Sequence, residues 1–203
     1  SPVLVATPTA AIIVPRDSIW SYLDNGSDQG LAWRDPLFND SSWVTGSAEL
    51  GYGDGDEATV VNFGPNPNNK YITTYFRHAF NVTDISTISG ATLNLLRDDG
   101  AVVYLNGTEV FRSNMPASPV TVSTLASLAV GGVNEAGYNK ACIDPALLVN
   151  GQNVLAVEVH QANVTSSDIS FNLELSASPI TRGPYLQTGT PTSMTLRWRT
   201  CDL

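Results

Sequence analysis

The amino-acid sequence predicts an all-β protein built as a β-sandwich. About ten runs of apolar, aromatic and β-branched residues alternate with clusters of Gly, Pro, Asn and Asp, which is typical of sandwiches. At most one helical turn interrupts these runs. Hydrophobic residues make up 42% of the 203-residue chain and charged residues 14%, so the composition favours a full core beneath a mostly uncharged polar surface.

The clearest element is a hairpin over residues 97–112, which read RDDGAVVYLNGTEVFR. Apolar residues fill positions 101–105, and β-branched and aromatic residues occur within 108–112. Asn106 and Gly107 lie between these runs, and Asn-Gly predicts a tight turn because both residues accept a positive φ.

One helical turn and several further strands are predicted besides the hairpin. Asp144 before Pro145 predicts one helical turn, with the aspartate as N-cap and proline at the first helical position. Pro8 and Pro15 confine the first two strands to an edge or a terminus. The other predicted strands cover residues 3–5, 11–14, 19–23, 71–82, 91–96, 153–161 and 170–176.

The chain is predicted to contain one complete domain, residues 1–178, and the start of a second, residues 179–203. The boundary lies near Ser178-Pro179, and two short strands are expected beyond it. A segment of this length is too short to bury a core of its own.

Charge and composition exclude several classes of function. The net charge of −9 argues against nucleic-acid binding, which needs basic side chains to neutralise phosphates. No segment is apolar for long enough to span a membrane. Cys142 and Cys201 fit no metal-binding spacing, and the sequence leaves open whether they pair or remain separate thiols.

Several motifs together resemble the galactose-binding-like jelly-roll modules of large secreted bacterial proteins, and parts of them are similar to the sugar-binding domains of glycoside hydrolases. The resemblance covers about residues 15–177 and implies a jelly-roll sandwich, an extracellular location and, in many such modules, a structural Ca²⁺. The residues that carry it are FNDSSW (38–43), LGYGDGDEAT (50–59), TTYFRHAF (73–80), RDDGAVVYLNGTEVFRSNMP (97–116), NGQNVLAVEVHQ (150–161) and SSDISFNLEL (166–175).

The C-terminal stretch RGPYLQTGTPTSMTLRWRT resembles the first strands of the fibronectin-type-III-like domain of purple acid phosphatases and related metallophosphoesterases. The resemblance implies that this chain is part of a larger secreted protein with downstream domains as its partners. No GxSxG, HExxH or P-loop motif occurs here, so we expect no enzyme activity from this chain itself.

An acidic, Gly-rich loop is the candidate metal site. Asp54, Asp56 and Glu57 lie within residues 49–59, ELGYGDGDEAT. Carboxylates and backbone carbonyls that glycines allow to turn inward are the oxygen ligands that Ca²⁺ takes. The spacing also suits a solvated acidic loop, and that alternative stays open.

Asp98 and Asp99, just before Gly100, are the first candidate ligand-binding residues. They could accept hydrogen bonds from sugar hydroxyls or bind a cation. Alternatively, one of them caps the turn and the other pairs with Arg97 or Arg112. Adjacent strand residues point to opposite faces, so the two are poor candidates for a catalytic carboxylate pair.

The other candidate ligand-binding residues are aromatic or lie at a strand end. An exposed aromatic ring stacks on the apolar face of a sugar, and three aromatic residues lie in or beside predicted loops, whereas Trp20, Trp43, Phe76 and Phe80 are expected in the core. His160 and Gln161 end a predicted strand, where they could bind a ligand or simply be packed. The three stacking candidates are Trp33, Tyr52 and Tyr71.

These observations predict a non-catalytic accessory module of a secreted protein. It would bind carbohydrate or a cell-surface polymer, with Ca²⁺ as a structural clamp. The alternative is a structural, adhesive or assembly module without a small ligand, whose exposed edge strands pair with a neighbour.

Overall fold

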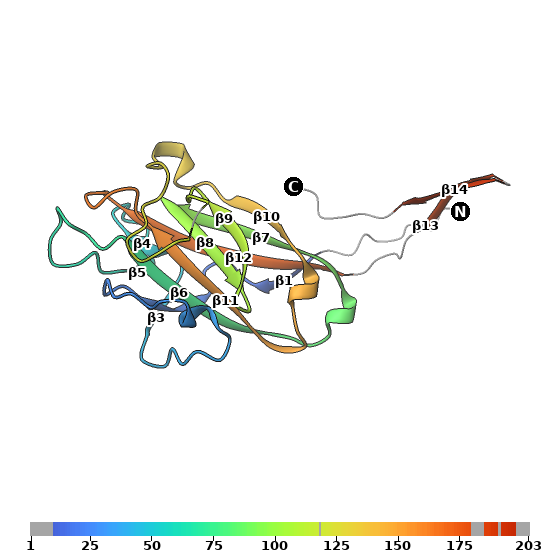
Figure 1. Ribbon diagram of the computed structural model, residues 1–203, viewed down its shortest axis with the longest axis horizontal. Coiled ribbons are helices and arrows are strands. Elements are labelled where there is room, and N and C mark those ends of the chain that lie inside the picture. Colours follow the sequence, from blue (N-terminus) through green and yellow to red (C-terminus); the bar gives the residue numbers. More distant parts are fainter. Residues whose placement is uncertain (1–9, 118, 180–184, 191, 198–203) are drawn as a thin grey trace.

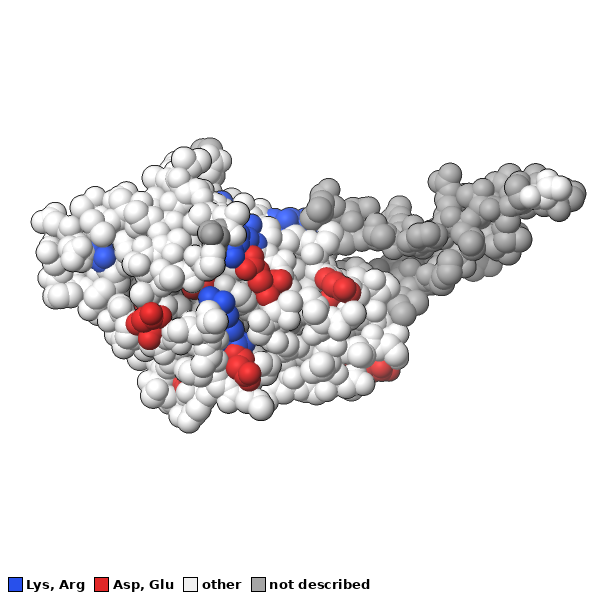
Figure 2. Space-filling view, viewed as in Figure 1, with Lys and Arg blue, Asp and Glu red and all other residues white. Residues whose placement is uncertain are grey.

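A computed structural model describes residues 10–117, 119–179, 185–190 and 192–197. Two mainly antiparallel sheets pack face to face and form a sandwich (Figure 1). This architecture confirms the predicted all-β fold of jelly-roll type. Figure 2 shows one face of the molecule, where charged side chains of both signs are sparse on a mostly uncharged surface.

The first sheet has β12 near its centre, with β7 on one side and β4 and β1 on the other. All its pairings are antiparallel except that between β4 and β5. Its strands are β10 (Asn139–Ile143), β7 (Ile88–Asp98), β12 (Ile169–Pro179), β4 (Leu50–Tyr52) and β5 (Thr59–Val60) in that order, with β1 (Ala11–Val14) also paired to β12.

The second sheet contains the predicted hairpin at one edge. Asn106 and Gly107 have φ values of 50° and 84°, which confirms the Asn-Gly turn. The strand order is β3 (Val44–Ser47), β2 (Ile19–Leu23), β6 (Thr73–Val82), β11 (Gly151–His160), β8 (Gly100–Leu105) and β9 (Thr108–Ser113).

The described residues contain short 3₁₀ turns in place of helices. The predicted turn after Asp144 is one of them, and the aspartate Oδ1 accepts a hydrogen bond from the backbone N–H of Ala146 at 2.9 Å. The turns are η1 (Ala32–Arg34), η2 (Ile85–Thr87), η3 (Gly132–Asn134) and η4 (Pro145–Leu147). In the part of the chain that the structure describes, no helix has the length and apolar character needed to cross a membrane.

Beyond β12, the two strands expected in the C-terminal stretch form a separate antiparallel pair, β13 (Tyr185–Thr190) and β14 (Ser193–Arg197). Their assignment to a fibronectin-type-III-like domain and the boundary at residue 178 remain predictions. Cys142 is disulfide-bonded, so the alternative of separate thiols, which the sequence left open, is not found for it. Cys201 and the predicted strand at residues 3–5 lie outside the described residues.

Aromatic rings fill the core between the sheets. Phe171 stacks on Phe76 with ring centroids 4.2 Å apart, and Trp20 meets Phe171 edge-on at 4.9 Å. Trp20, Phe76 and Phe80 are buried as predicted. Trp43 is also buried, but in a second cluster outside the sandwich core.

The second cluster lies on the outer face of the second sheet. Segments 23–43 and 115–126 contribute apolar side chains that cover Val102, Tyr104 and Ala156. Because of this cover, every residue from Asn153 to His160 is buried, although strict alternation along a strand normally indicates one solvated face.

Candidate metal centre and adjoining polar pocket

Carboxylates from four separate segments meet at one end of the sandwich. Figure 1 shows β4 and β5, which flank one of these segments, at the left-hand end of the sandwich. The segments are the entrance to β4, the β4–β5 loop, the stretch after η3 and the entrance to β12. The sheet register brings the last of these beside β4, since Ser170 pairs with Gly51.

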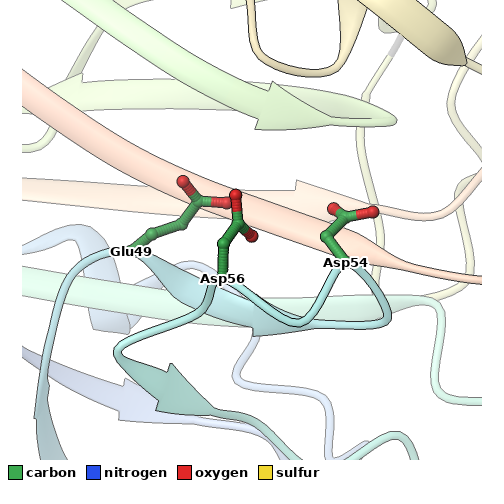
Figure 3. A group of neighbouring side chains, drawn as sticks. All are labelled: Glu49, Asp54 and Asp56. Carbon is green, nitrogen blue, oxygen red and sulfur yellow. The ribbon is translucent and has the colours of Figure 1, made fainter.

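Two groups of carboxylates share one member. Glu49, Asp54 and Asp56 each offer an oxygen atom, and these atoms lie within 4.8 Å of one another. Figure 3 shows these three side chains on the same side of β4 and the loop that follows. Asp54 also forms such a group with Glu135 and Asp168. We call these five residues the acidic cluster.

Glu57, the third predicted metal ligand, belongs to neither group. Its carboxylate accepts hydrogen bonds from the backbone N–H groups of Asp54 at 2.9 Å and Gly55 at 3.0 Å. Burial raises the pKa of Glu57, but the backbone hydrogen bonds outweigh burial and lower the pKa overall. Glu57 therefore stabilises the turn of its own loop, and Glu49 is the third carboxylate in the group with Asp54 and Asp56.

Burial and neighbouring charges make ionisation unfavourable for two members of the acidic cluster, Glu49 and Asp54. Burial, and then the charges of Asp54, Asp56 and Glu57, raise the pKa of Glu49, although a hydrogen bond to Ser170 partly offsets them. Burial and neighbouring carboxylates, among them Asp168, raise the pKa of Asp54 in the same way. A bound cation reverses this effect because it stabilises the charged carboxylates.

Asp98 lies beside the acidic cluster on the same face of the first sheet. It pairs in register with Ser170, so both side chains project to the same side. The Ser170 hydroxyl donates to Asp54 Oδ2 at 3.1 Å. Asp98 is fully buried, and neither of its carboxylate oxygens has a hydrogen-bond partner in the described part of the chain.

The surroundings of Asp98 favour its neutral form. Burial is the main cause, followed by the charge of Asp99 and those of Asp168 and Glu135, and together they raise the pKa of Asp98 to about 9. The carboxyl is therefore protonated at neutral pH unless a cation binds next to it.

Asp99 connects two loops. Its Oδ1 accepts from the backbone N–H of Val130 at 2.7 Å, and its Oδ2 accepts from Ala162 N–H at 2.6 Å and from the Ser166 hydroxyl at 3.3 Å. This arrangement fits the alternative in which one aspartate is a structural capping residue. The pairing of the other with an arginine is not found, since Arg112 pairs with Glu109 and Arg97 forms no ion pair with a described carboxylate.

The expectation that Trp33 and Tyr52 present open rings is wrong. Trp33 is fully buried against Tyr75 at 4.8 Å and Tyr104 at 5.7 Å, because segment 23–43 folds back over the second sheet. Tyr52 is also buried, and its hydroxyl accepts from Gln161 Nε2 at 2.6 Å. Neither ring offers a free face for a sugar.

Tyr71, the third stacking candidate, is half-buried. Its ring packs so closely on Gly26 that a Cβ added there would lie 2.3 Å from Tyr71 Cδ1. Gly64 approaches the same ring. The turn glycines therefore occupy much of the ring surface.

His160 and Gln161 point into the protein. His160 is fully buried, and its Nδ1 lies 2.9 Å from Thr73 Oγ1 and 2.8 Å from the Thr124 carbonyl oxygen. Its Nε2 lies 3.3 Å from Glu158 Oε2. Gln161 is also buried, and its Oε1 has no described partner. These contacts match the interpretation of His160 as a packed, hydrogen-bonded residue.

A polar pocket of about 730 Å³ adjoins the acidic cluster. It lies between β7, β10 and the segment that contains η3. The same segment contributes to both features, since Glu135 belongs to the acidic cluster and Asn134 lines the pocket. The polar side chains that line the pocket are Arg97, Asn114, Asn134, Tyr138 and Asn139.

Sequence reasoning missed most of this region. Glu49 had a signal, since it begins the acidic stretch that contains Asp54 and Asp56. Glu135, Asp168 and the pocket residues had none, because each lies in a segment far along the chain and only the sheet pairings bring them together.

Comparisons with known proteins support the fold. Neither a family model nor a curated protein matches the chain. Among solved structures, Bacteroides uniformis β-glucuronidase 2 is similar with a TM-score of 0.53 and 17% identity, over 83% of this chain and 18% of that one.

Two further solved structures show a similar fold. A β-glucuronidase from glycoside hydrolase family 2 has a TM-score of 0.50 and 16% identity, over 87% of this chain and 18% of that one. Ruminococcus gnavus β-glucuronidase in complex with uronic isofagomine has a TM-score of 0.50 and 11% identity, over 88% and 30%. The chain thus spans less than a third of the length of each of these proteins, and at such identities the similarity shows the fold alone.

Proposed function

We propose that this chain is a non-catalytic, carbohydrate-binding accessory module of a secreted multidomain protein, in which Ca²⁺ clamps the loops beside a polar sugar pocket. The observation that carries the proposal is the η3 segment, which provides Glu135 to the acidic cluster and Asn134 to the pocket. A cation bound at Glu135 would hold the wall of the pocket in place.

The donor set of the acidic cluster fits Ca²⁺. Ca²⁺ takes roughly six to eight oxygen ligands, whereas transition metals favour His and Cys. The cluster consists only of carboxylates, and Asp98 adds a buried carboxyl without a hydrogen-bond partner on the same face. Glu49, Asp54, Asp56, Glu135 and Asp168 would hold the ion, which would neutralise the charges that now raise the pKa of Glu49 and Asp54.

The lining of the pocket fits a sugar. The side-chain amides of three asparagines can form hydrogen bonds with hydroxyl groups, and Tyr138 supplies an aromatic ring. The solved structures of similar fold described above are β-glucuronidases, which act on sugars, and the chain aligns with only a fraction of each. Both facts support an accessory role in a carbohydrate-active protein.

One observation favours the second candidate function, a structural or adhesive module. β3 is an edge strand of the second sheet, and the side chains of Val44 and neighbouring Ile19 are 56% and 62% exposed. Such an edge can pair with a strand of another protein.

A glycan array probed with the chain, with Ca²⁺ and with EDTA, tests the proposal. We expect binding in Ca²⁺ that is reduced in EDTA and in Glu135→Gln. The matched control is Glu109→Gln, which removes a carboxylate paired with Arg112 outside the acidic cluster. A blank array together with self-association in gel filtration would instead support the structural module.

A further inference from the structure

Arg97 in the polar pocket differs from the other arginines of this protein. The residue is only 9% exposed, and its Nε donates to Ser113 Oγ at 2.9 Å. Among the arginines whose side chains the structure describes, Arg97 alone has no carboxylate oxygen within 4.0 Å. The other four pair with an acidic residue, namely Arg16 with Glu174, Arg34 with Glu158, Arg77 with Asp40 and Arg112 with Glu109.

The nearest acidic residues do not serve as the missing partner. Asp99 uses both carboxylate oxygens to accept from Val130, Ala162 and Ser166. Asp98 projects to the other face of the first sheet, with Ser170. A largely buried arginine without an ion-pair partner is unfavourable, even though the charges of Asp98 and Asp99 act on it from a distance. A ligand carboxylate that binds it through two parallel hydrogen bonds reduces that cost.

The rest of the pocket presents acceptors for hydroxyl groups. Asn114 Nδ2 donates to the carbonyl oxygens of Asp99 and Leu128, and Asn139 Nδ2 donates to those of Leu95 and Gly137. Because these amide nitrogens are already engaged, the amide oxygens are the groups left for a ligand. The positively charged Arg97, next to amide oxygens that accept from hydroxyl groups, matches a sugar that carries a carboxylate.

We propose that the pocket binds a uronic acid residue, with its carboxylate on Arg97 and its hydroxyls on the asparagines. This inference rests on the proposed function and names the class of sugar. The net charge of −9 opposes an anionic ligand at long range, but salt screens charges beyond about 8 Å at physiological ionic strength. Ca²⁺ at the adjacent acidic cluster would reduce the local negative charge, so uronate affinity should rise with Ca²⁺.

The test is calorimetric titration of the full chain in Ca²⁺ with D-galacturonic and D-glucuronic acid, D-galactose, D-glucose and sodium acetate. We expect a uronic acid to bind roughly tenfold or more tightly than its neutral counterpart, since a charge-assisted bidentate pair is about twice as strong as neutral hydrogen bonds. Arg97→Met should abolish this preference, and Arg97→Lys should retain part of it. Arg112→Met, an arginine outside the pocket, is the matched control.

The outcomes separate the two proposals. Equal binding of neutral and acidic sugars, unchanged in Arg97→Met, overturns the uronic acid and leaves the carbohydrate-binding module intact. Binding of acetate as tight as that of the uronic acids shows a simple anion site and also overturns the inference. If no sugar or glycan binds, both proposals fail.

A second variant guards against misfolding of Arg97→Met. Asn134 is exposed, and its side chain forms no hydrogen bond within the described residues, so Asn134→Ala should fold normally. We expect it to weaken uronic acid binding severalfold, as the loss of one hydrogen bond does. Unchanged affinity in this variant, together with unchanged affinity in Arg97→Lys, contradicts the inference.

Discussion

Two fully buried carboxyl groups in this protein have opposite surroundings. Glu158, on the outer face of β11, accepts from the Tyr104 hydroxyl at 2.7 Å and lies 3.2 Å from Arg34 Nη2 and 3.3 Å from His160 Nε2. Asp98, at the end of β7, has no hydrogen-bond partner among the described residues and several carboxylates nearby. The Glu158 carboxylate thus has a hydrogen-bond donor and a positive charge beside it, whereas Asp98 has neither among the described residues. The comparison separates a structural polar network from the proposed cation site.

Loss of the Glu158 carboxylate should have the largest effect. Glu158→Ala leaves the half-buried Arg34 and the buried Tyr104 hydroxyl without their partner, so we expect unfolding free energy to fall by about 3–5 kcal/mol in urea denaturation. Glu174→Ala, which removes the partner of the half-exposed Arg16, is the control and should cost at most about 1 kcal/mol. Equal losses in the two variants would contradict the view that the Glu158 network is a buried structural unit.

Ca²⁺ should act at the acidic cluster beside Asp98. Saturating Ca²⁺ binds only the folded state and should stabilise the EDTA-treated protein by about 2.7 kcal/mol at a concentration 100-fold above Kd. Asp54→Asn should remove most of this gain because Asp54 belongs to both groups of carboxylates. Differential scanning calorimetry measures the shift in Tm, and an identical Ca²⁺ response in wild type and Asp54→Asn would place the ion elsewhere.

Asp98 should make the stability of the protein depend on pH. Its pKa is about 9 in the folded protein and near the ordinary value of 3.8 in the unfolded chain, so the folded state holds a proton that the unfolded state releases. Its contribution to stability is full below pH 4 and is lost as pH rises towards 9. In EDTA, Asp98→Asn should flatten this decline, as urea denaturation between pH 5 and 9 (roughly the span between the two pKa values) would show.

The smallest effect is expected for Glu57. Because its carboxylate accepts from the backbone of its own loop, Glu57→Gln should change unfolding free energy by less than about 1 kcal/mol. The Ca²⁺ affinity measured by calorimetry should remain close to that of the wild type. A loss of affinity as large as in Asp54→Asn would make Glu57 a metal ligand, as its spacing in the sequence suggested.

Local patterns predicted the parts of the fold that depend on neighbours in sequence. The Asn106-Gly107 turn, the Asp144 cap and the strands around them follow from backbone preferences that one or two residues decide. The same reasoning found Asp54 and Asp56, which are two positions apart. It did not find that Trp33 is buried, because a loop tryptophan gives no local sign of the sheet onto which its segment folds.

The sequence by itself determined an all-β chain, its main hairpin and an acidic loop, since strand alternation and turn chemistry act over a few residues. Only the tertiary structure decided which acidic groups gather and which polar groups find partners. Glu135 and Asp168 reach Asp54 because η3 ends, and β12 begins, near β4, and Arg97 lacks the acidic partner that Arg34 finds in Glu158. Electrostatic interactions depend on distance in space, and the folded chain sets those distances through sheet pairings between segments far apart in sequence.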